Sequence, residues 1–161
     1  MGCVPPLATG LTLATAAPAY AADPPPPQIF DAGVACDFAL RVDQSLAERR
    51  LSKTFLDENG NPVKILSVGK GPDTKLTNLD NGRTLTLRGN GSGSITTVNA
   101  DGTFTIRQFG HSILILFPTD VPAGPTTTLI AGTAVFASDA DFNFTVQKIT
   151  GRTTDLCDAL A

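Results

Sequence analysis

The single histidine is the only side chain in this sequence that titrates near neutral pH without help from its surroundings. His111 follows Gly110 and precedes the apolar segment 113–117, so it could act as a general base at the end of a strand. Catalysis would also need a carboxylate to orient the ring and a nucleophile. The adjacent Ser112 cannot be that nucleophile, because neighbouring residues of a strand point to opposite faces. We therefore favour a structural or surface position for His111.

The carboxylates include three close pairs, an arrangement that glycoside hydrolysis and cation binding both use. The pairs are Asp57/Glu58, Asp139/Asp141 and Asp155/Asp158. Asp139 and Asp141 are two residues apart, so in a strand they would share a face with Asn143 and could hold Ca²⁺ weakly. These acids occupy turn sequences, however, where Asp and Asn accept hydrogen bonds from nearby backbone. We favour the turn role and expect no metal and no other cofactor.

Residues 89–94 (Gly-Asn-Gly-Ser-Gly-Ser) have the glycine content of a phosphate-binding loop but lack its other features. No Lys follows them, and the next residues predict a strand instead of a helix whose N-terminus could bind an anion. We interpret the segment as a bend between two strands. The formal charge of −3 gives no basic field for a phosphate backbone, which argues against nucleic-acid binding.

The N-terminal segment is typical of a secretory signal peptide. Residues 1–22 carry no charged side chain, and residues 4–17 are mildly apolar. The small residues Ala19 and Ala21 fit a signal-peptidase site, with cleavage expected after Ala21 or Ala22. The apolar stretch is too short to anchor the chain in a bilayer. We expect a secreted protein without a transmembrane anchor; the alternative is a disordered Ala/Pro-rich head on a cytosolic protein.

Two cysteines remain in the expected mature chain, Cys36 near its start and Cys157 near its end. In an oxidising compartment, a single pair of cysteines predicts one disulfide. A metal pair or a catalytic thiol is the alternative, but a metal would need further His or Cys ligands, and only His111 is present. Because the bond would close a long loop, it could stabilise the fold by ~4–5 kcal/mol on the chain-entropy model.

After a Pro-rich extended lead-in over residues 23–35, the chain repeats a strand-like run followed by a turn. Residues 84–88 and 103–107 alternate apolar and polar side chains, which is typical of antiparallel strands with one buried face. Asn-Gly and Asp-Gly pairs between the runs favour hairpins. Residues 113–117 are apolar at every position, so both faces of that strand should be covered. The segment 45–50 fits either one helical turn or the start of a strand.

We predict one all-β domain over residues 36–161, an antiparallel up-and-down barrel of about eight to ten strands with one disulfide. Hairpin-connected strands leave two exposed edges unless the sheet closes. A crosslink between Cys36 and Cys157 would join the two ends that closure brings together. A two-sheet β-sandwich has the same hairpin signals and is the alternative.

Several turn and disulfide motifs follow one another along the mature chain. They are Cys36-Asp37-Phe38, the hairpin Leu-Thr-Asn-Leu-Asp-Asn-Gly at 76–82, the break at 89–93, Asp101-Gly102-Thr103, and Asp-Leu-Cys-Asp-Ala-Leu at 155–160. Together they resemble a group of small exported proteins of actinobacteria. This resemblance implies export and an all-β body, and it carries over no catalytic or binding residue. A weaker likeness in architecture, to the small barrels of the allene oxide cyclase and dirigent type, implies an apolar barrel interior.

The sequence favours a non-enzymatic exported β-domain, either structural or binding a partner or a small apolar ligand, because no catalytic constellation accompanies the apolar strand faces. The mature chain has neither Trp nor Tyr to stack on sugars, which argues against a carbohydrate-binding module. One alternative is a small barrel enzyme that acts on an apolar substrate, with His111 or an inward carboxylate as its acid or base. Another is a cell-envelope interaction protein that uses its Phe-bearing surface, or its Pro-rich tail as a tether.

Overall fold

The computed structural model describes residues 23–46 and 50–161, which contain ten β-strands and one short helix, α1 (Leu156–Leu160). The expected signal peptide, with its cleavage site at Ala21 or Ala22, lies outside the described residues. No helix in the described part of the chain is long and apolar enough to cross a membrane. The strands are β1 (Gln28–Phe30), β2 (Leu40–Gln44), β3 (Arg50–Leu56), β4 (Pro62–Lys70), β5 (Thr74–Asn78), β6 (Thr84–Leu87), β7 (Gly91–Val98), β8 (Phe104–Leu116), β9 (Thr126–Ser138) and β10 (Phe144–Asp155).

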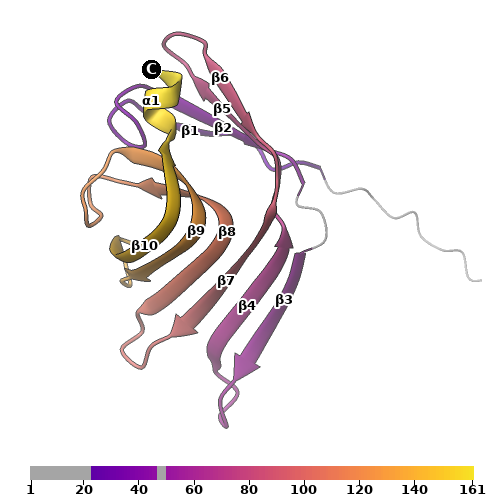
Figure 1. Cartoon of the computed structure of the whole chain (residues 1–161). Coiled ribbons are helices and arrows are strands. Elements are labelled where there is room, and N and C mark those ends of the chain that lie inside the picture. The colour runs from indigo at the N-terminus through magenta and orange to yellow at the C-terminus, as the bar shows by residue number, and fades with distance from the viewer. Residues whose placement is uncertain (1–22, 47–49) are drawn as a thin grey trace, which may run out of the picture.

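The strands form two antiparallel sheets, and Figure 1 shows the smaller sheet above the larger one. Four strands pair in the order β1-β2-β5-β6, and six pair in the order β10-β9-β8-β7-β4-β3. The prediction of an all-β fold is therefore confirmed. The closed up-and-down barrel is not found among the described residues, because each sheet keeps two edge strands. The sandwich-like alternative fits the two sheets at least as well.

The chain crosses between the sheets three times, and these crossings explain why the strands do not form one continuous meander. The expected hairpins β3/β4, β5/β6, β7/β8 and β9/β10 all form. The strands that flank a crossing do not pair with each other; instead β2 pairs with β5, and β4 pairs with β7. Residues 71–73 and 88–90 make two of the crossings.

A row of glycines bends the six-stranded sheet across three adjacent strands. Gly110 of β8, Gly132 of β9 and Gly151 of β10 lie opposite one another in register. A Cβ atom on Gly132 would lie 2.0 Å from the carbonyl oxygen of Thr150, so a side chain cannot fit there without a shift of the backbone. Gly110 and Gly151 have φ values of +88° and +101°, which glycine adopts without steric cost. The strands curl at this row, as Figure 1 shows for β8, β9 and β10.

The inner face of this bend encloses an apolar cluster that contains residues from both arms. Its members are Leu114, Leu116, Ile130, Ala134 and Phe136, with Ile106, Phe144 and Val146 packed against them. Val121 N–H donates to the Phe144 carbonyl, and Val146 N–H donates to the Val121 carbonyl, each at 2.7 Å. The buried Asp120 carboxylate accepts the N–H groups of Phe117 and Phe144 at 2.6 Å. These hydrogen bonds join the two arms where the bend opens.

A second apolar cluster lies on the outer face of the same strands, where the four-stranded sheet covers them. Its buried residues come from the segment before β2, from β2 and β5, and from α1: Ala35, Cys36, Leu40, Val42, Leu76, Leu156 and Leu160. Ile113 and Ile115 pack against this cluster, whereas the intervening Leu114 and Leu116 belong to the inner cluster. This part of β8 is therefore covered on both faces, which explains why it is apolar at every position.

A disulfide between Cys36 and Cys157 joins the loop before β2 to α1, with a Cα–Cα distance of 5.6 Å and a sequence separation of 121 residues. The predicted crosslink is thus confirmed. Thr127 on β9 donates its hydroxyl to the Ala35 carbonyl at 2.9 Å beside this bond. The Asn78 amide on β5 donates to the Leu160 carbonyl at 3.0 Å. Together these bonds fasten the four-stranded sheet and α1 onto the bent sheet.

Two of the crossings lie directly against each other. Gly71 N–H donates to the Asn90 carbonyl at 3.1 Å, and Gly89 N–H donates to the Asp73 carboxylate at 2.7 Å. A Cβ atom on Gly89 would lie 1.9 Å from the carbonyl oxygen of Gly71. Of the glycine-rich segment predicted as a bend, Gly89 and Asn90 belong to a crossing between sheets, whereas residues 91–94 are the beginning of β7. Gly89 is required by the close approach of two backbones.

We expect Gly89→Ala to lower the free energy of unfolding by about 1–3 kcal/mol, because the new methyl group forces the two crossings apart. Gly91→Ala is the matched control in the same segment, since a Cβ atom at Gly91 has no heavy atom within 4 Å. Its effect should remain within about 0.5 kcal/mol. Urea denaturation of both variants measures the difference, and equal stabilities would contradict the packing argument.

Candidate functional site

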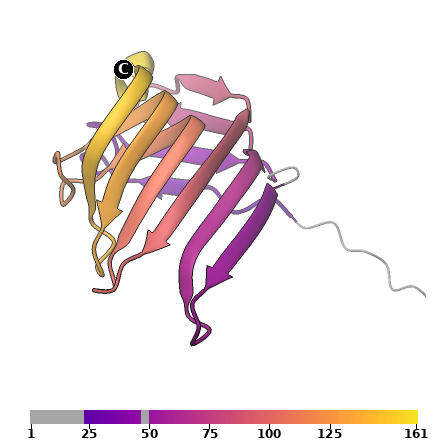
Figure 2. The same ribbon diagram turned by 60° about the horizontal axis from the view of Figure 1, so that its bottom comes forward.

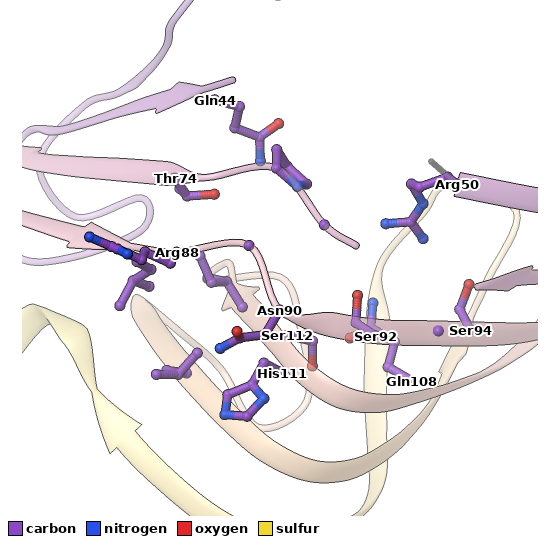
Figure 3. A pocket seen from close by; sticks show the side chains of 17 residues that line it. Gln44, Arg50, Thr74, Arg88, Asn90, Ser92, Ser94, Gln108, His111 and Ser112 are labelled. Atoms are coloured by element: carbon purple, nitrogen blue, oxygen red, sulfur yellow. The ribbon is translucent and has the colours of Figure 1, made fainter. Parts of the chain in front are cut away.

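A pocket of about 320 Å³ lies where the chain crosses between the two sheets. The ends of β2, β5 and β6 contribute to its wall on one side, and β3, β7 and β8 contribute on the other (Figure 3). Most of the lining side chains are polar, and those with hydroxyl or amide groups are Gln44, Thr74, Asn90, Ser92, Ser94, Gln108 and Ser112. Its volume falls within the range of small-molecule sites. The pocket is therefore a candidate binding site.

The polar lining continues the inner face of the bend. Ser94 of β7 lies directly opposite Gln108 of β8, so both side chains are on the same face of the sheet. Ser92, opposite Gly110, and Ser112, four residues beyond Gln108, belong to that face too. The inner face is thus apolar at the cluster described above and hydroxyl-rich at β7 and the middle of β8.

The pocket carries basic side chains and no carboxylate. Arg50, Arg88 and His111 line it, and the lining contains neither Asp nor Glu. The Arg50 guanidinium donates to the Ser67 hydroxyl at 3.2 Å. In Figure 3 this guanidinium is directed towards Gln44 and the labelled serines, whereas that of Arg88 points away from them. Asp73 lies just outside the lining, where its carboxylate accepts Gly89 N–H. A small anion therefore suits this pocket better than a cation.

His111 lies in the middle of β8, next to the bend, and not at the beginning of a strand. The two strand-like runs that the sequence shows around Gly110 are one continuous strand, so the glycine marks a bend inside it. His111 and Ser112 both line the pocket, but as consecutive strand residues they point to opposite faces. With no carboxylate in the lining to orient the exposed His111 ring, the pocket does not assemble an acid–base pair with a nucleophile.

The candidate cation ligands Asp139, Asp141 and Asn143 lie in the turn between β9 and β10. The Asp139 carboxylate accepts the Asn143 side-chain amide at 3.0 Å and the N–H groups of Asn143 and Asp141 at 2.9 Å each. These hydrogen bonds, first of all those from Asn143, lower the pKa of Asp139. Within residues 23–46 and 50–161, no group of three or more His, Cys, Asp and Glu side chains could hold a metal ion. The arrangement supports the turn role.

Three hairpin turns of the six-stranded sheet, which Figure 2 shows at the same end, have one common design. In each turn the N–H of the fourth residue donates to the carbonyl of the first, which is Asp57, Asn99 or Asp139. The Asp57 carboxylate accepts the N–H groups of Asn59 and Asn61 at 2.8 Å, as Asp139 does in its own turn. In the turn that begins at Asn99, the acid is instead at the third position, where Asp101 accepts the Thr103 hydroxyl at 2.7 Å. These hydrogen bonds lower the pKa of Asp57 and of Asp101. The turns also share a left-handed position, which is occupied by Gly60 (φ +85°), Gly102 (φ +82°) and Phe142 (φ +64°). Phe142 is thus the exception in a position that favours glycine.

Sequence reasoning found His111 but missed the amides and hydroxyls around it. Gln108 is the clearest sequence signal of a polar site. It occupies the next position on the strand face that Phe104 and Ile106 share, but its side chain is polar. The position of Arg50 in the pocket depends on the pairing of β3 with β4 and of β4 with β7, which no local pattern predicts.

Comparisons of the chain with family models, with curated proteins and with solved structures found no significant match. The function is therefore argued from the geometry of the pocket and of the turns.

Acid should weaken the fold through the turn carboxylates. Asp57, Asp101 and Asp139 have lowered pKa values in the folded state. Their contribution to stability is therefore complete above the unfolded pKa of about 3.9, and it is lost as the pH falls through the lower folded values. We expect the urea midpoint to stay level from about pH 7 to pH 5 and to fall below about pH 4.

Asp139→Asn should reduce this acid sensitivity, because its amide has no carboxyl group to protonate. Asp141→Asn is the matched control, since Asp141 contributes its backbone N–H to the turn. Identical acid profiles of the two variants would show that the Asp139 hydrogen bonds do not cause the effect.

Proposed function

We propose that the protein is an exported, non-enzymatic binding domain whose pocket between the two sheets holds a small anionic ligand. The observation that carries the proposal is a pocket towards whose polar lining the Arg50 guanidinium is directed, with hydroxyl and amide groups around it and no carboxylate in the lining. The signal-peptide pattern, the resemblance to small exported proteins and the Cys36–Cys157 disulfide support export.

A polar ligand fits this pocket better than the apolar ligand that we expected from the sequence. The apolar side chains of the bend pack against one another in a single cluster. The pocket beside that cluster is instead lined mainly by hydroxyl, amide and guanidinium groups. An apolar ligand would leave these groups without hydrogen-bond partners, at a cost of about 1–3 kcal/mol for each group that it removes from water.

A binding role fits the pocket better than the enzyme alternative. General acid–base catalysis at His111 would need a partner that holds the imidazole in one orientation. The lining supplies no carboxylate for this purpose, and the neighbouring Ser112 points to the other face of β8.

Binding of a dicarboxylate tests the proposal directly. We expect isothermal titration calorimetry to detect succinate but not the neutral analogue succinamide, with affinity that falls as salt is added. Arg50→Gln should weaken succinate binding about tenfold, because it removes the cation directed into the pocket. Arg152→Gln, on β10 and outside the pocket lining, is the matched control and should bind like the parent. Equal binding of succinate and succinamide, or equal losses in both variants, would refute the proposal.

A second candidate function, interaction with the cell envelope, is favoured by Phe142. Its side chain is 70% exposed, and its backbone has the left-handed conformation that costs a non-glycine residue about 1–2 kcal/mol. The equivalent positions of the two other hairpins are Gly60 and Gly102. A strained position that exposes an aromatic ring contributes little to the fold. We propose that Phe142 anchors the protein to an envelope component.

Phe142→Gly should raise the free energy of unfolding by about 1 kcal/mol and should also move the protein from the cell-wall fraction into the medium. Phe142→Ala is the matched control, because it removes the ring but keeps a residue with a Cβ atom in the left-handed position. It should lose envelope retention without the gain in stability. Unchanged fractionation of both variants would exclude Phe142 as an anchor.

A further inference from the structure

The strands of the six-stranded sheet are basic although the chain as a whole is acidic. They contain one carboxylate, that of Asp155, which is the last residue of β10. The whole chain has 15 Asp and Glu against 12 Lys and Arg, so its acids lie almost entirely outside these strands. The same strands contain seven Lys and Arg residues, which are Arg50, Lys53, Lys64, Lys70, Arg107, Lys148 and Arg152.

Six of the seven basic residues share the outer face of the sheet. Directly opposed residues of adjacent strands lie on the same face, and one such row crosses all six strands. Its members are Lys53, Leu66, Ile95, Arg107, Val135 and Lys148. Even spacing along β4 and β10 adds Lys64, Lys70 and Arg152 to this face. Arg50, three residues before Lys53, belongs to the inner face.

We call these six residues the basic face, and all six are exposed. Figure 2 shows the strands that carry them side by side, with the smaller sheet behind. Lysines on edge strands commonly prevent pairing with another sheet, but Arg107 lies on the central strand β8. Five of the six have no ion-pair partner among the described residues, and these are Lys53, Lys64, Arg107, Lys148 and Arg152.

The spacing of these cations does not suit a small ligand. Adjacent strands are about 5 Å apart, which separates Lys53 from Arg107 by about 15 Å and Arg107 from Lys148 by about 10 Å. A small anion can contact one of these side chains but not several of them. The basic face therefore suits an extended anionic partner, to which each cation adds its own attraction.

Apolar side chains on the same face favour a lipid bilayer over a soluble polymer. Leu51 and Phe55 lie two residues to either side of Lys53, so all three side chains point outwards. Leu51 is 74% exposed and Phe55 is 38% exposed. At a bilayer surface, apolar side chains enter the boundary of the acyl chains while the ammonium groups contact lipid phosphates. A soluble polyanion offers no apolar phase for Leu51.

We propose that the basic face docks onto a bilayer of anionic phospholipid, with Leu51 and Phe55 inserted at the edge of the sheet. This inference goes beyond the pocket, because Arg50 belongs to the inner face, and it does not involve Phe142 in the β9–β10 turn. Since the chain is net negative, attraction to an anionic surface comes from this face and not from the overall charge.

Sedimentation with lipid vesicles tests the inference. We expect the protein to bind vesicles that contain phosphatidylglycerol but not vesicles of phosphatidylcholine alone, and added salt should weaken the binding. Arg107→Gln combined with Lys148→Gln should weaken it about 25-fold, which is about fivefold for each charge removed. Lys75→Gln combined with Arg83→Gln is the matched control, because it removes the same charge from β5 and the turn after it. This control should bind like the parent.

Leu51→Ser separates a bilayer from a soluble polyanion. It should weaken vesicle binding about fivefold, because the inserted apolar side chain is lost. It should leave the binding of polyphosphate, the probe for a soluble polyanion, unchanged.

Failure to bind phosphatidylglycerol vesicles would overturn the inference, and so would equal losses in the two double variants. Vesicle binding that does not depend on Leu51, together with tight binding of polyphosphate, would show a polymer site instead of a bilayer site. The pocket is tested separately, since neither Arg107 nor Lys148 lines it. Their double variant should bind succinate like the parent, and its circular dichroism spectrum verifies its fold.

Discussion

A sheet whose central strands are apolar on both faces can bury both only if something covers each face, and here the sheet covers one face by bending over itself. At the bend, neighbouring strands approach so closely that a Cβ atom would collide with a backbone carbonyl oxygen. Gly110, Gly132 and Gly151 avoid this collision because they have no side chain. Glycine inside a strand costs about 0.5–1 kcal/mol, whereas each fully buried Leu, Ile or Phe stabilises the fold by about 1.5–3 kcal/mol. The inner cluster therefore more than offsets the three glycines.

The same bend creates the pocket. At the bend, the middle of β8 pairs with β7 close to the place where the chain crosses to the smaller sheet. The side chains of the inner face change there from apolar to polar. The crossings bring Gln44 and Thr74 over this region, while the pairing of β4 with β7 places Arg50 of the edge strand β3 near it. The polar groups thus come from segments far apart in the sequence and are positioned by contacts between backbones, such as the approach of Gly89 to Gly71.

The sequence predicts those features that depend on local chemistry. Alternating side chains predict the all-β fold, Asn-Gly and Asp-Gly pairs predict the hairpins, and Cys36 and Cys157 predict the disulfide. It does not predict that β2 pairs with β5, because alternation shows which face is buried and not which strand lies alongside. A glycine within a strand also gives the same signal as a glycine in a turn, so Gly110 suggested a strand end. His111 was therefore placed at an end and the pocket around it was missed.

The disulfide also constrains the order in which the molecule can be completed during biosynthesis. Cys36 is synthesised 121 residues before Cys157, so the four-stranded sheet has no covalent closure while the later strands are being made. Leu40, Val42 and Leu76 share their cluster with Leu156 and Leu160, so the smaller sheet is incompletely covered until α1 docks. The bond therefore cannot form until Cys157 has been synthesised, by which point all ten strands are already part of the chain.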